Sequence, residues 1–496
     1  MRARGAWAHS WVLVAATGLI APSGAARADG AETDAAAPLQ LLGAVHVHSS
    51  FSTGLVSLDQ VAAKAVDRGI EVLVLSDDDV LEVEYGVPFL RNLLRLGHRE
   101  RAAATHAGLE AYLAAIDEIQ ERHPELIVID GVESAPFYWW DRDADGTWLV
   151  RDWNKHMLAV DLRTAEAYAG LPVLGGPAIW RWRWASLALL WPLPGLLYAL
   201  WLGRRLHSWW VRGPVALVCL LCLADGAVVG FKVSDMDPYH GDLGVAPHQR
   251  FIDYVNARGG LATWAHPEAA STIAPRSLLG GLVRVESRTK AHADDLVATR
   301  DYTAFAALYA DHITATEPGR QWDEVLVEYL TGQRGRPAWG MGEIDYHVDE
   351  EGGRLDDIST IFLVGQRTRS EVLEAMREGR MYASRGGDRS LALTTFAVVT
   401  EAGAAGAGEE IPAYGRPRVR CLIERRDGAE AEVAVRLVRG DDTGAVEMVA
   451  EIAGQTPLEL EHVGPALTGG SRAYYRLLAR SPGGQVTSNP IFVSGG

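Results

Sequence analysis

Two histidines spaced by two residues, His46 and His48, follow the first apolar run, Leu41 to Val45. On a β-strand, residues two apart point to the same face, so both imidazoles can reach one cation. A His-x-His pair by itself is also common at ordinary surface positions. The pair therefore indicates a metal site only where other ligand types accompany it.

Further residues of metal-ligand type recur at the ends of later apolar runs. In an α/β barrel, strand ends converge on one mouth, where such folds place their chemistry. One member, His156, opens a run instead of closing it, and two others repeat the spacing of the first pair. The full set is Asp77, Asp78, Glu133, His156, His266, Asp345 and His347.

Short apolar runs alternate with helical patterns from about residue 40 onward, and this alternation predicts a parallel α/β architecture. Each run is largely apolar, as expected of strands that are covered on both faces. The predicted strands are Leu41 to Val45, Ile70 to Leu75, Leu126 to Ile129, Met157 to Val160, Leu261 to Trp264 and Leu282 to Val285.

Two segments carry the signals of helix ends. Between Ser57 and Gly69 the apolar residues follow helical spacing, Ser57 and Gln60 resemble a capping box, and Gly69 suits the C-terminal stop. Ser370 to Gly379 is predicted as a late helix with its own cap and stop. From about Leu391 onward short alternating runs replace the helical pattern and predict a small antiparallel β-sandwich.

Two apolar runs interrupt the α/β pattern. Ala185 to Leu202 contains no charge, and Pro214 to Phe231 contains only Asp225. Each run is 18 residues long, close to the roughly 20 that cross a bilayer. Seven of the 16 tryptophans lie between Trp180 and Trp210, most of them at run edges, as in an aromatic belt. We predict a two-span hairpin that contacts membrane lipid through residues 185–231.

The alternative to membrane spans is a pair of buried or surface-lying amphipathic helices. Pro192, Pro194 and Asp225 favour this alternative, because charge within a span is costly. Arginine and lysine do not decide the topology, since three lie in the connecting loop and three flank the hairpin. Orientation therefore rests on the N-terminus.

The first thirty residues have the features of a secretory signal. Arg2 and Arg4 form a basic start, an apolar run covers Trp11 to Ile20, and Ala26-Arg27-Ala28 resembles a cleavage site. An uncleaved anchor helix is the alternative, and both readings export the rest of the chain. We expect a periplasmic or extracytoplasmic location, with the hairpin as membrane anchor.

Length and charge narrow the function classes. At 496 residues the chain should form about two or three folding units. A formal net charge of -17 repels a phosphate backbone and attracts cations, so no nucleic-acid partner is expected. Three cysteines, two of them inside an apolar run, indicate no disulfide framework.

Taken in order, the motifs resemble those of the polymerase and histidinol phosphatase (PHP) superfamily, and within it the carbaryl-hydrolase-like metallohydrolases. The resemblance covers roughly residues 40–390 with the hairpin inserted. The motifs are His46-Val47-His48-Ser49, Ser76-Asp77-Asp78, Gly131-Val132-Glu133, Lys155-His156-Met157-Leu158, Gly259-Gly260 through Ala265-His266-Pro267, Asp345-Tyr346-His347 and the closing segment Glu374 to Tyr382.

This resemblance implies a distorted (β/α)7 barrel with up to three divalent metals, Zn, Mn or Fe, at its mouth. The first metal would be held by His46, His48, Glu133 and Asp345. Glu133 would bridge to a second metal held by His156 and His266. His347 would belong to a third.

The sequence departs from the family pattern at the third metal. The usual Asp or His after the first motif is Thr53, and the usual Thr-Asp-His is Ser76-Asp77-Asp78. A site of Asp78 and His347 alone would be weak or would select a different ion. We therefore expect two metals and an incomplete third position.

Paired metals can generate hydroxide at neutral pH and hold both the attacking and the leaving oxygen, which suits hydrolysis of a phosphate or ester. Asp77, Asp78 and a histidine without an assigned role are the candidates for moving the leaving-group proton, and the sequence does not choose among them. Lys155 and Arg288 are candidates for binding an anionic small-molecule substrate, against the plainer interpretation that they are solvated charges at loop ends.

Combined, these patterns predict a signal peptide over residues 1–28, a barrel over 40–171 and 248–390, an inserted transmembrane hairpin and linker over 172–247, and a β-sandwich over 391–496. The leading function is a membrane-tethered metal-dependent hydrolase of a small phosphoester or ester. The alternative is a degenerate, non-catalytic barrel that binds a metal or ligand as a receptor or assembly subunit, with its protein partner unknown. A polymerase-associated proofreading domain is opposed by export and by the acidic charge.

Overall fold

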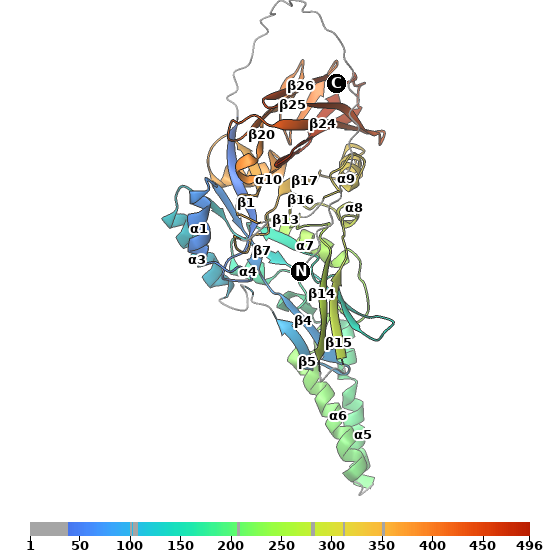
Figure 1. Ribbon diagram of the computed structural model, residues 1–496. Helices are drawn as coiled ribbons and strands as arrows, with labels where there is room; N and C mark the ends of the chain where they lie inside the picture. The colour runs from blue at the N-terminus through green and yellow to red at the C-terminus, as the bar shows by residue number, and fades with distance from the viewer. Residues whose placement is uncertain are drawn as a thin grey trace, which may run out of the picture. The chain divides into compact units, whose positions relative to one another are not determined.

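The computed structural model describes residues 38–99, 102, 108–205, 209–278, 283–310, 313–349 and 353–496. The chain divides into two units, Met1–Ala37 and Pro38–Gly496, and the predicted signal peptide lies outside the described residues. The second unit is a mixed α/β structure whose elements are labelled in Figure 1.

One sheet places the first predicted strand beside strands from the end of the α/β region. β1 (Leu39–Val47) runs parallel to β2 (Val72–Leu75), and β2 runs parallel to β6 (Ile127–Ile129). On its other side β1 pairs antiparallel with β18 (Ile358–Val364), followed by β19 (Met381–Arg385). β2 and β6 are buried throughout, which confirms the two-sided covering inferred from their apolar sequences, and β18, which was not predicted, is buried almost throughout.

The second sheet supplies most of the strand ends that carry candidate ligands. Its order is β17-β16-β13-β10-β7-β3. The strands are β3 (Asp77–Asp78), β7 (Gly131–Ser134), β10 (Met157–Val160), β13 (Leu261–Trp264), β16 (Ala304–Leu308) and β17 (Trp339–Gly342). A parallel bridge between Val47 of β1 and Tyr346, in the segment that follows β17, connects the two sheets. A closed seven-stranded barrel stays a prediction.

The expectation of a parallel sheet is wrong for β10, which runs antiparallel to both β7 and β13. Parallel neighbours need a crossover connection, usually a helix. The connection from β7 to β10 instead contains the hairpin of β8 (Trp139–Arg142) and β9 (Trp148–Arg151), so the chain re-enters the sheet from the same end. This reversal explains why His156 precedes its strand, while the other ligands lie near the ends of theirs or after them.

Helices pack apolar faces onto the main hydrophobic core. The predicted helix at Ser57 is confirmed as α1 (Leu58–Asp67), with the capping box between Ser57 and Gln60 present. The predicted late helix is α10 (Arg369–Glu378), capped by Thr368 and ended by Gly379 in the left-handed conformation. The other helices outside the hairpin are α3 (Leu109–Arg122), α4 (Ala165–Ala169), α7 (Ala246–Asn256), α8 (Asp295–Ala298) and α9 (Gln321–Leu330).

The C-terminal region consists of strands apart from a short 3-10 turn, Gly387–Arg389. One sheet has the order β21-β20-β23-β26 and shares a hydrophobic core with β24, β27 and β29. β28 pairs with β19, so the sheet of the α/β region continues into this part. The strands are β20 (Leu391–Thr400), β21 (Gly403–Ala405), β22 (Glu410–Ala413), β23 (Arg418–Arg425), β24 (Glu432–Asp441), β25 (Val446–Gln455), β26 (Leu458–Val463), β27 (Arg472–Ser481), β28 (Gly484–Ser488) and β29 (Ile491–Gly495).

A buried ion pair links the C-terminal strands to helix α9. Arg476 of β27 donates from Nε and Nη2 to the two oxygens of Asp323, each at 2.7 Å. The hydroxyl of Tyr474 donates to the same carboxylate at 2.6 Å. Trp322, the neighbouring aromatic, is fully buried against Phe305, as expected of a core side chain.

Three β-hairpins surround the strand ends that carry the ligands. They are β4 (Glu82–Val87) with β5 (Leu90–Arg99), β8 with β9, and β14 (Ser271–Leu278) with β15 (Val283–Thr289). The strand predicted at Leu282 to Val285 is part of β15, whose first four residues are intermediate or exposed in burial, and so it is not a two-sided core strand. A separate hydrophobic core joins β4, β8 and β9 to the base of the helical insertion.

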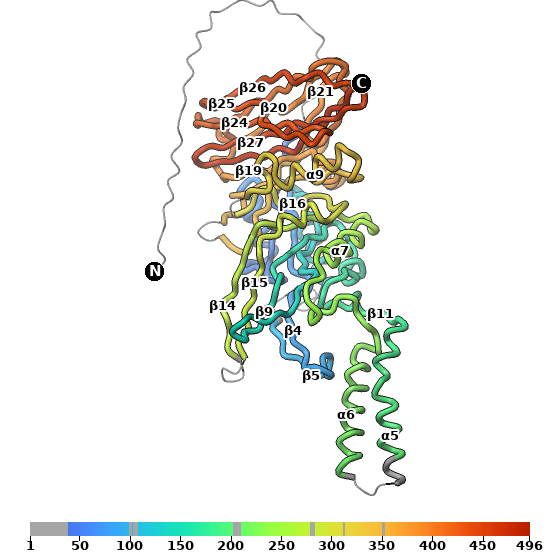
Figure 2. Tube along the Cα trace, turned by 90° about the vertical axis from the view of Figure 1, so that its right-hand side faces the viewer, coloured from blue at the N-terminus to red at the C-terminus, as the bar shows by residue number. Residues whose placement is uncertain are grey.

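The insertion contains two adjacent helical segments, which Figure 2 shows running side by side. The first comprises a 3-10 turn, Trp184–Leu190, and α5 (Pro192–Arg205), and the second is α6 (Trp209–Val228). Its base is closed by the short 3-10 turn Pro177–Ile179 and by β11 (Trp180–Arg181) paired with β12 (Val233–Ser234).

Two stretches of this insertion are long and apolar enough to cross a membrane, Trp184–Trp201 and Trp210–Val228. Only 17% of each stretch is buried. Most of both stretches therefore lies outside the cores of the described residues, and membrane crossing stays a prediction.

Candidate metal centre

The carboxylate of Glu133, on β7, lies at the centre of a group of histidines. Its Oε1 is 3.2 Å from His46 Nε2, 2.7 Å from His156 Nδ1 and 3.4 Å from His266 Nε2. Its Oε2 is 3.3 Å from His48 Nε2. One buried carboxylate thus contacts four imidazoles, the arrangement needed by an oxygen ligand that two metal ions share.

Asp345 completes the group from the connection after β17. Its Oδ1 is 3.5 Å from both His46 Nε2 and His48 Nε2. The structure therefore brings together all six residues expected at the first two metals, from strand ends far apart in the chain. Three subsets have ligand atoms within 4.8 Å of one another: His46, His48 and Asp345; His46, Glu133 and His266; and His48, Asp78 and Glu133.

The backbone aims three of these side chains through left-handed conformations. φ is 69° at His46, 25° at His266 and 50° at Asp345. Non-glycine residues held there cost about 1–3 kcal/mol each, and they concentrate at functional sites. His46 also lies where the register between β1 and β2 shifts. His46 and His48 thus reach Glu133 across a local bulge in β1, and not through the regular strand alternation that the sequence suggested.

The donor set fits a divalent metal. Imidazole nitrogens and carboxylate oxygens without thiolate suit Zn, Mn or Fe, and the geometry does not choose among them. Within the described residues, several of these buried ligand atoms have no aligned hydrogen-bond partner, as metal ligands would. They are His46 Nε2, His48 Nε2, His156 Nδ1, His266 Nδ1 and Glu133 Oε1.

Electrostatics in the cluster also favour a cation. Burial opposes protonation of His48, but Asp78, Asp345 and Glu133 outweigh it and raise its pKa to about 10. In the same way, carboxylates led by Glu133 overcome burial and raise the pKa of His266 to about 8. Burial alone would raise the pKa of Glu133, but His156 and His46 hold it well below its usual range.

These shifts predict that metal affinity rises with pH, because a metal must displace protons from the imidazoles. The folded-state pKa values of His266 and His48 lie above the usual 6.5, so protonation of these residues stabilises the ion-free protein. This stabilisation is complete below about pH 6.5. It is lost as the pH rises through about 8 at His266 and about 10 at His48. Competition titrations with a metal-sensitive dye should show tighter binding at about pH 8 than at about pH 6, with proton release. Equal affinity at both values would contradict the charge state inferred here.

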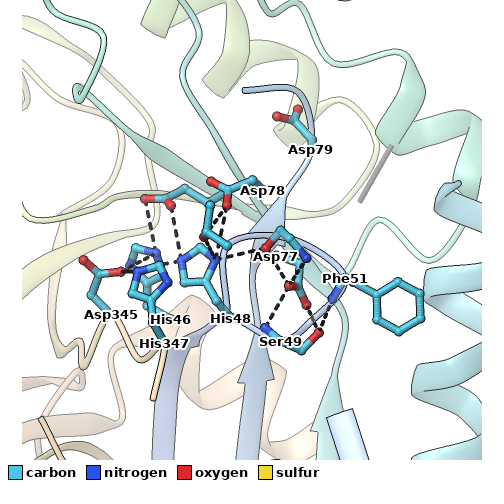
Figure 3. A network of polar contacts seen from close by, with 12 residues as sticks. His46, His48, Ser49, Phe51, Asp77, Asp78, Asp79, Asp345 and His347 are labelled. Atoms are coloured by element: carbon cyan, nitrogen blue, oxygen red, sulfur yellow. Dashed lines mark hydrogen bonds and ion pairs between the residues drawn. The ribbon is translucent and has the colours of Figure 1, made fainter. Parts of the chain in front are cut away.

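Asp77 does not reach the cluster. Its oxygens accept hydrogen bonds from the backbone N–H and hydroxyl of Ser49, both at 2.8 Å, and from those of Ser52 at 3.1 and 2.6 Å. Figure 3 shows this carboxylate turned toward Ser49 and away from His46. The catalytic role considered for Asp77 is therefore not supported. Its carboxylate oxygens accept hydrogen bonds from Ser49 and Ser52 and so hold the loop that follows His48.

The two residues expected at a third metal, Asp78 and His347, both lie next to His48. Asp78 Oδ2 lies 3.5 Å from His48 Nδ1 and accepts a hydrogen bond from the Thr53 hydroxyl at 2.7 Å. His347 stacks on His48 with ring centroids 4.3 Å apart, and its Nε2 is 3.3 Å from Asp345 Oδ1. Asp78 thus groups with His48 and Glu133, and His347 lies against Asp345 and the ring of His48.

The two cations considered for substrate binding are engaged by carboxylates. Lys155 Nζ is 2.8 Å from Asp295 Oδ2. Arg288 pairs with Glu286 and, at 3.1 Å, with Asp143 Oδ2. Their charges are already compensated, which favours the plainer interpretation over anion binding.

Glu343, which the sequence patterns did not single out, is fully buried beside the cluster. Its Oε1 is 2.9 Å from His46 Nδ1 and accepts a hydrogen bond from the His266 backbone N–H at 3.2 Å. Glu343 therefore fixes which nitrogen of His46 faces Glu133. The available signal was the spacing of two that relates Glu343 to Asp345 and His347 at a strand end.

We predict that Glu343→Gln lowers metal affinity by about 10–100-fold, the usual cost of losing a carboxylate that orients a ligand histidine. Metal retained during dialysis against graded chelator measures the change. Glu121→Gln, on the exposed face of α3, is the matched control. Unchanged affinity in Glu343→Gln would show that His46 needs no such support.

Comparisons with known proteins add little to this geometry. No protein-family model and no curated protein matches the chain. Among solved structures, a two-domain protein from Bacteroides vulgatus containing a predicted PHP-like metal-dependent phosphoesterase is 11% identical, with a TM-score of 0.34, over 88% of this chain and 90% of that one. The DNA glycosylase AlkC of Pseudomonas fluorescens, bound to DNA with an abasic site analog, reaches 15% identity and a TM-score of 0.14 over 21% of this chain and 30% of that one. Conclusions about function therefore rest on the cluster itself.

Proposed function

We propose that this chain is a metal-dependent hydrolase of the PHP type that acts on a small phosphoester or ester. The observation that carries the proposal is the buried carboxylate of Glu133 in contact with four imidazoles, at 2.7 to 3.4 Å. His46, His48, Glu133 and Asp345 would hold one ion, and Glu133, His156 and His266 a second.

The residues around the cluster would orient the ligands and move protons. A bound pair of divalent ions supplies an activated water and compensates charge in the transition state. Glu343 orients His46, and Asp77 holds the loop that carries His48. Asp78 remains as the acid–base candidate, because it lies at the cluster, 3.5 Å from His48 Nδ1, and burial raises its pKa above the ordinary value.

The test uses the full-length protein purified in detergent. Metal content is measured together with turnover of a chromogenic phosphodiester, a phosphomonoester and a carboxyl ester. We expect about two equivalents of metal and turnover in at least one class, both lost in His266→Ala and retained in Glu121→Gln. Two equivalents of metal without turnover of any substrate would support the non-catalytic binding barrel instead.

We further propose that residues 185–231 anchor the protein as a two-span hairpin, with the metal centre on the exported side. Support comes from the length and exposure of the two apolar stretches. Tryptophans lie at both ends of the first stretch, Trp184 and Trp201, and at the start of the second, Trp210, and Trp184 is 82% and Trp210 72% exposed. At ~1.5 Å per residue the 19 residues of Trp210–Val228 span about 28 Å, close to the hydrocarbon thickness.

Orientation can be tested in cells. A reporter fused after Gly496 should be active only outside the cytoplasm, and protease added to intact spheroplasts should digest the α/β domain. Protection of that domain from the protease would reverse the proposed placement.

A further inference from the structure

The β4–β5 hairpin exposes a group of large apolar side chains beside the helical insertion. Phe89 is 78% exposed, Leu94 50% and Leu96 54%. Phe89 also has a φ of 70°, a left-handed conformation that an exposed aromatic residue adopts at a cost. Clustered exposed apolar side chains of this kind mark a binding surface more often than isolated ones do.

Asp225 attaches this hairpin to α6. Its Oδ1 accepts hydrogen bonds from the backbone N–H groups of Asn92 at 2.7 Å and Leu93 at 2.8 Å, and its Oδ2 accepts one from Asn92 Nδ2 at 3.0 Å. The carboxylate is therefore buried and satisfied by β5. The charge that argued against a membrane span is covered, and it lies three residues from the end of α6, at the base of the insertion.

The same hairpin is joined rigidly to the metal centre. β4 begins four residues after Asp78. Two aromatic side chains hold its backbone at Glu84. The Tyr138 hydroxyl accepts a hydrogen bond from the Glu84 N–H at 2.8 Å, and Trp140 Nε1 donates one to the Glu84 carbonyl oxygen at 2.8 Å. Tyr239, which follows the insertion, accepts the Gly86 N–H at 2.6 Å. One hydrophobic core thus connects β4, the hairpins near the ligands and the base of the insertion.

We propose that the β4–β5 hairpin is a third membrane-contacting element, which inserts Phe89, Leu94 and Leu96 into the bilayer interface and holds the metal centre over the lipid headgroups. Its substrate is then a phosphoester or ester carried by an amphiphile in that bilayer. The substrate half of this proposal rests on the proposed hydrolase function, and the surface half does not.

Local charges indicate that insertion is driven by apolar burial. Arg91 pairs with Asp237 at 3.4 Å and stacks on Tyr239, and Arg95 pairs with Glu84. These arginines are compensated, so they add little attraction to anionic lipid. Insertion should therefore be similar in vesicles of neutral lipid and in vesicles containing anionic lipid.

The depth of the hairpin is measured on the full-length protein reconstituted in phosphatidylcholine vesicles. The three native cysteines are replaced by alanine, and an environment-sensitive fluorophore is attached at Leu94→Cys or, as a control, at Val463→Cys, which is 45% exposed on β26. We expect a blue-shifted emission at position 94 that lipid-borne doxyl groups quench, with aqueous iodide quenching only position 463. Iodide quenching of position 94 to the same extent overturns the surface proposal. A blue shift without doxyl quenching also overturns it, because a second copy of the chain or another protein then covers the hairpin.

The substrate class is tested with the variant F89S/L94S/L96S. A chromogenic phosphodiester that bears acyl chains is presented in vesicles and compared with its soluble short-chain analogue. We expect turnover of the vesicle substrate to fall at least tenfold while turnover of the soluble analogue and metal content are unchanged. Equal turnover of both substrates by variant and wild type overturns the amphiphile assignment. Absence of metal and of all turnover in the wild type is instead the failure of the hydrolase proposal, and the fluorophore result still decides whether the hairpin inserts.

Discussion

Glu133→Gln should abolish the metal centre. The substitution keeps the shape of the side chain but removes the charge that His46, His48, His156 and His266 all face. Losing an orienting carboxylate near a metal already costs about 10–100-fold, so losing the shared ligand should lower metal affinity and turnover by more than about 100-fold. Metal content by mass spectrometry and turnover of the best substrate measure both effects.

The paired control for this variant is Glu121→Gln, which carries the same change on the exposed face of α3. It should retain wild-type metal content and activity. Secondary structure of Glu133→Gln, followed by circular dichroism, should remain close to wild type, because relieving a buried charge does not remove the packing of β7. Full metal occupancy in Glu133→Gln would show that the ions bind elsewhere in the protein.

Arg476→Met should cause the largest loss of stability. The substitution leaves the Asp323 carboxylate buried with only Tyr474 and the Gly319 N–H as donors. Breaking a buried ion pair by removing one partner costs about 3–5 kcal/mol, because a charge remains without compensation. Thermal unfolding in detergent, followed by circular dichroism, should show a midpoint lower by several degrees.

Two further variants separate this effect from a general loss of charge. Arg420→Met removes an exposed arginine that pairs with Glu461 at 3.1 Å, and should change stability by at most about 1 kcal/mol. The double variant Asp323→Leu/Arg476→Met should regain much of the lost stability, since neither buried charge then remains. A double variant no more stable than Arg476→Met alone would show that shape, and not charge, dominates at this position.

The proposed membrane anchor and the candidate metal cluster are connected through the residues between β3 and β5. Asp78 lies at the cluster, and Asn92 and Leu93 are held by Asp225 of α6. A movement of the anchor relative to the hairpin would therefore reach the loop that carries Asp78. Under the proposed membrane attachment, this connection gives a physical reason for a hydrophobic hairpin within the α/β domain, where it can position the metal cluster.

The sequence alone determined which residues are chemically able to bind metal and where strands of buried type occur. Met157–Val160 and Leu261–Trp264 match their predicted bounds, because apolar runs of strand length with two covered faces have few other uses. The ligand-type residues were named because they recur at the ends of apolar runs, and the resemblance to the PHP motifs implied which six of them hold the first two metals. Such local signals depend on neighbours in the chain and survive without knowledge of the fold.

Only the tertiary structure decided how these residues are used. Asp77 and Asp78 are adjacent and chemically identical, yet one secures Ser49 and Ser52 while the other faces His48. Likewise Glu343 becomes the support of His46, and Asp225 becomes the attachment of β5, through contacts spanning 297 and about 130 residues of chain. Burial and hydrogen bonding between distant segments set these roles, and no local pattern of residue types contains that information.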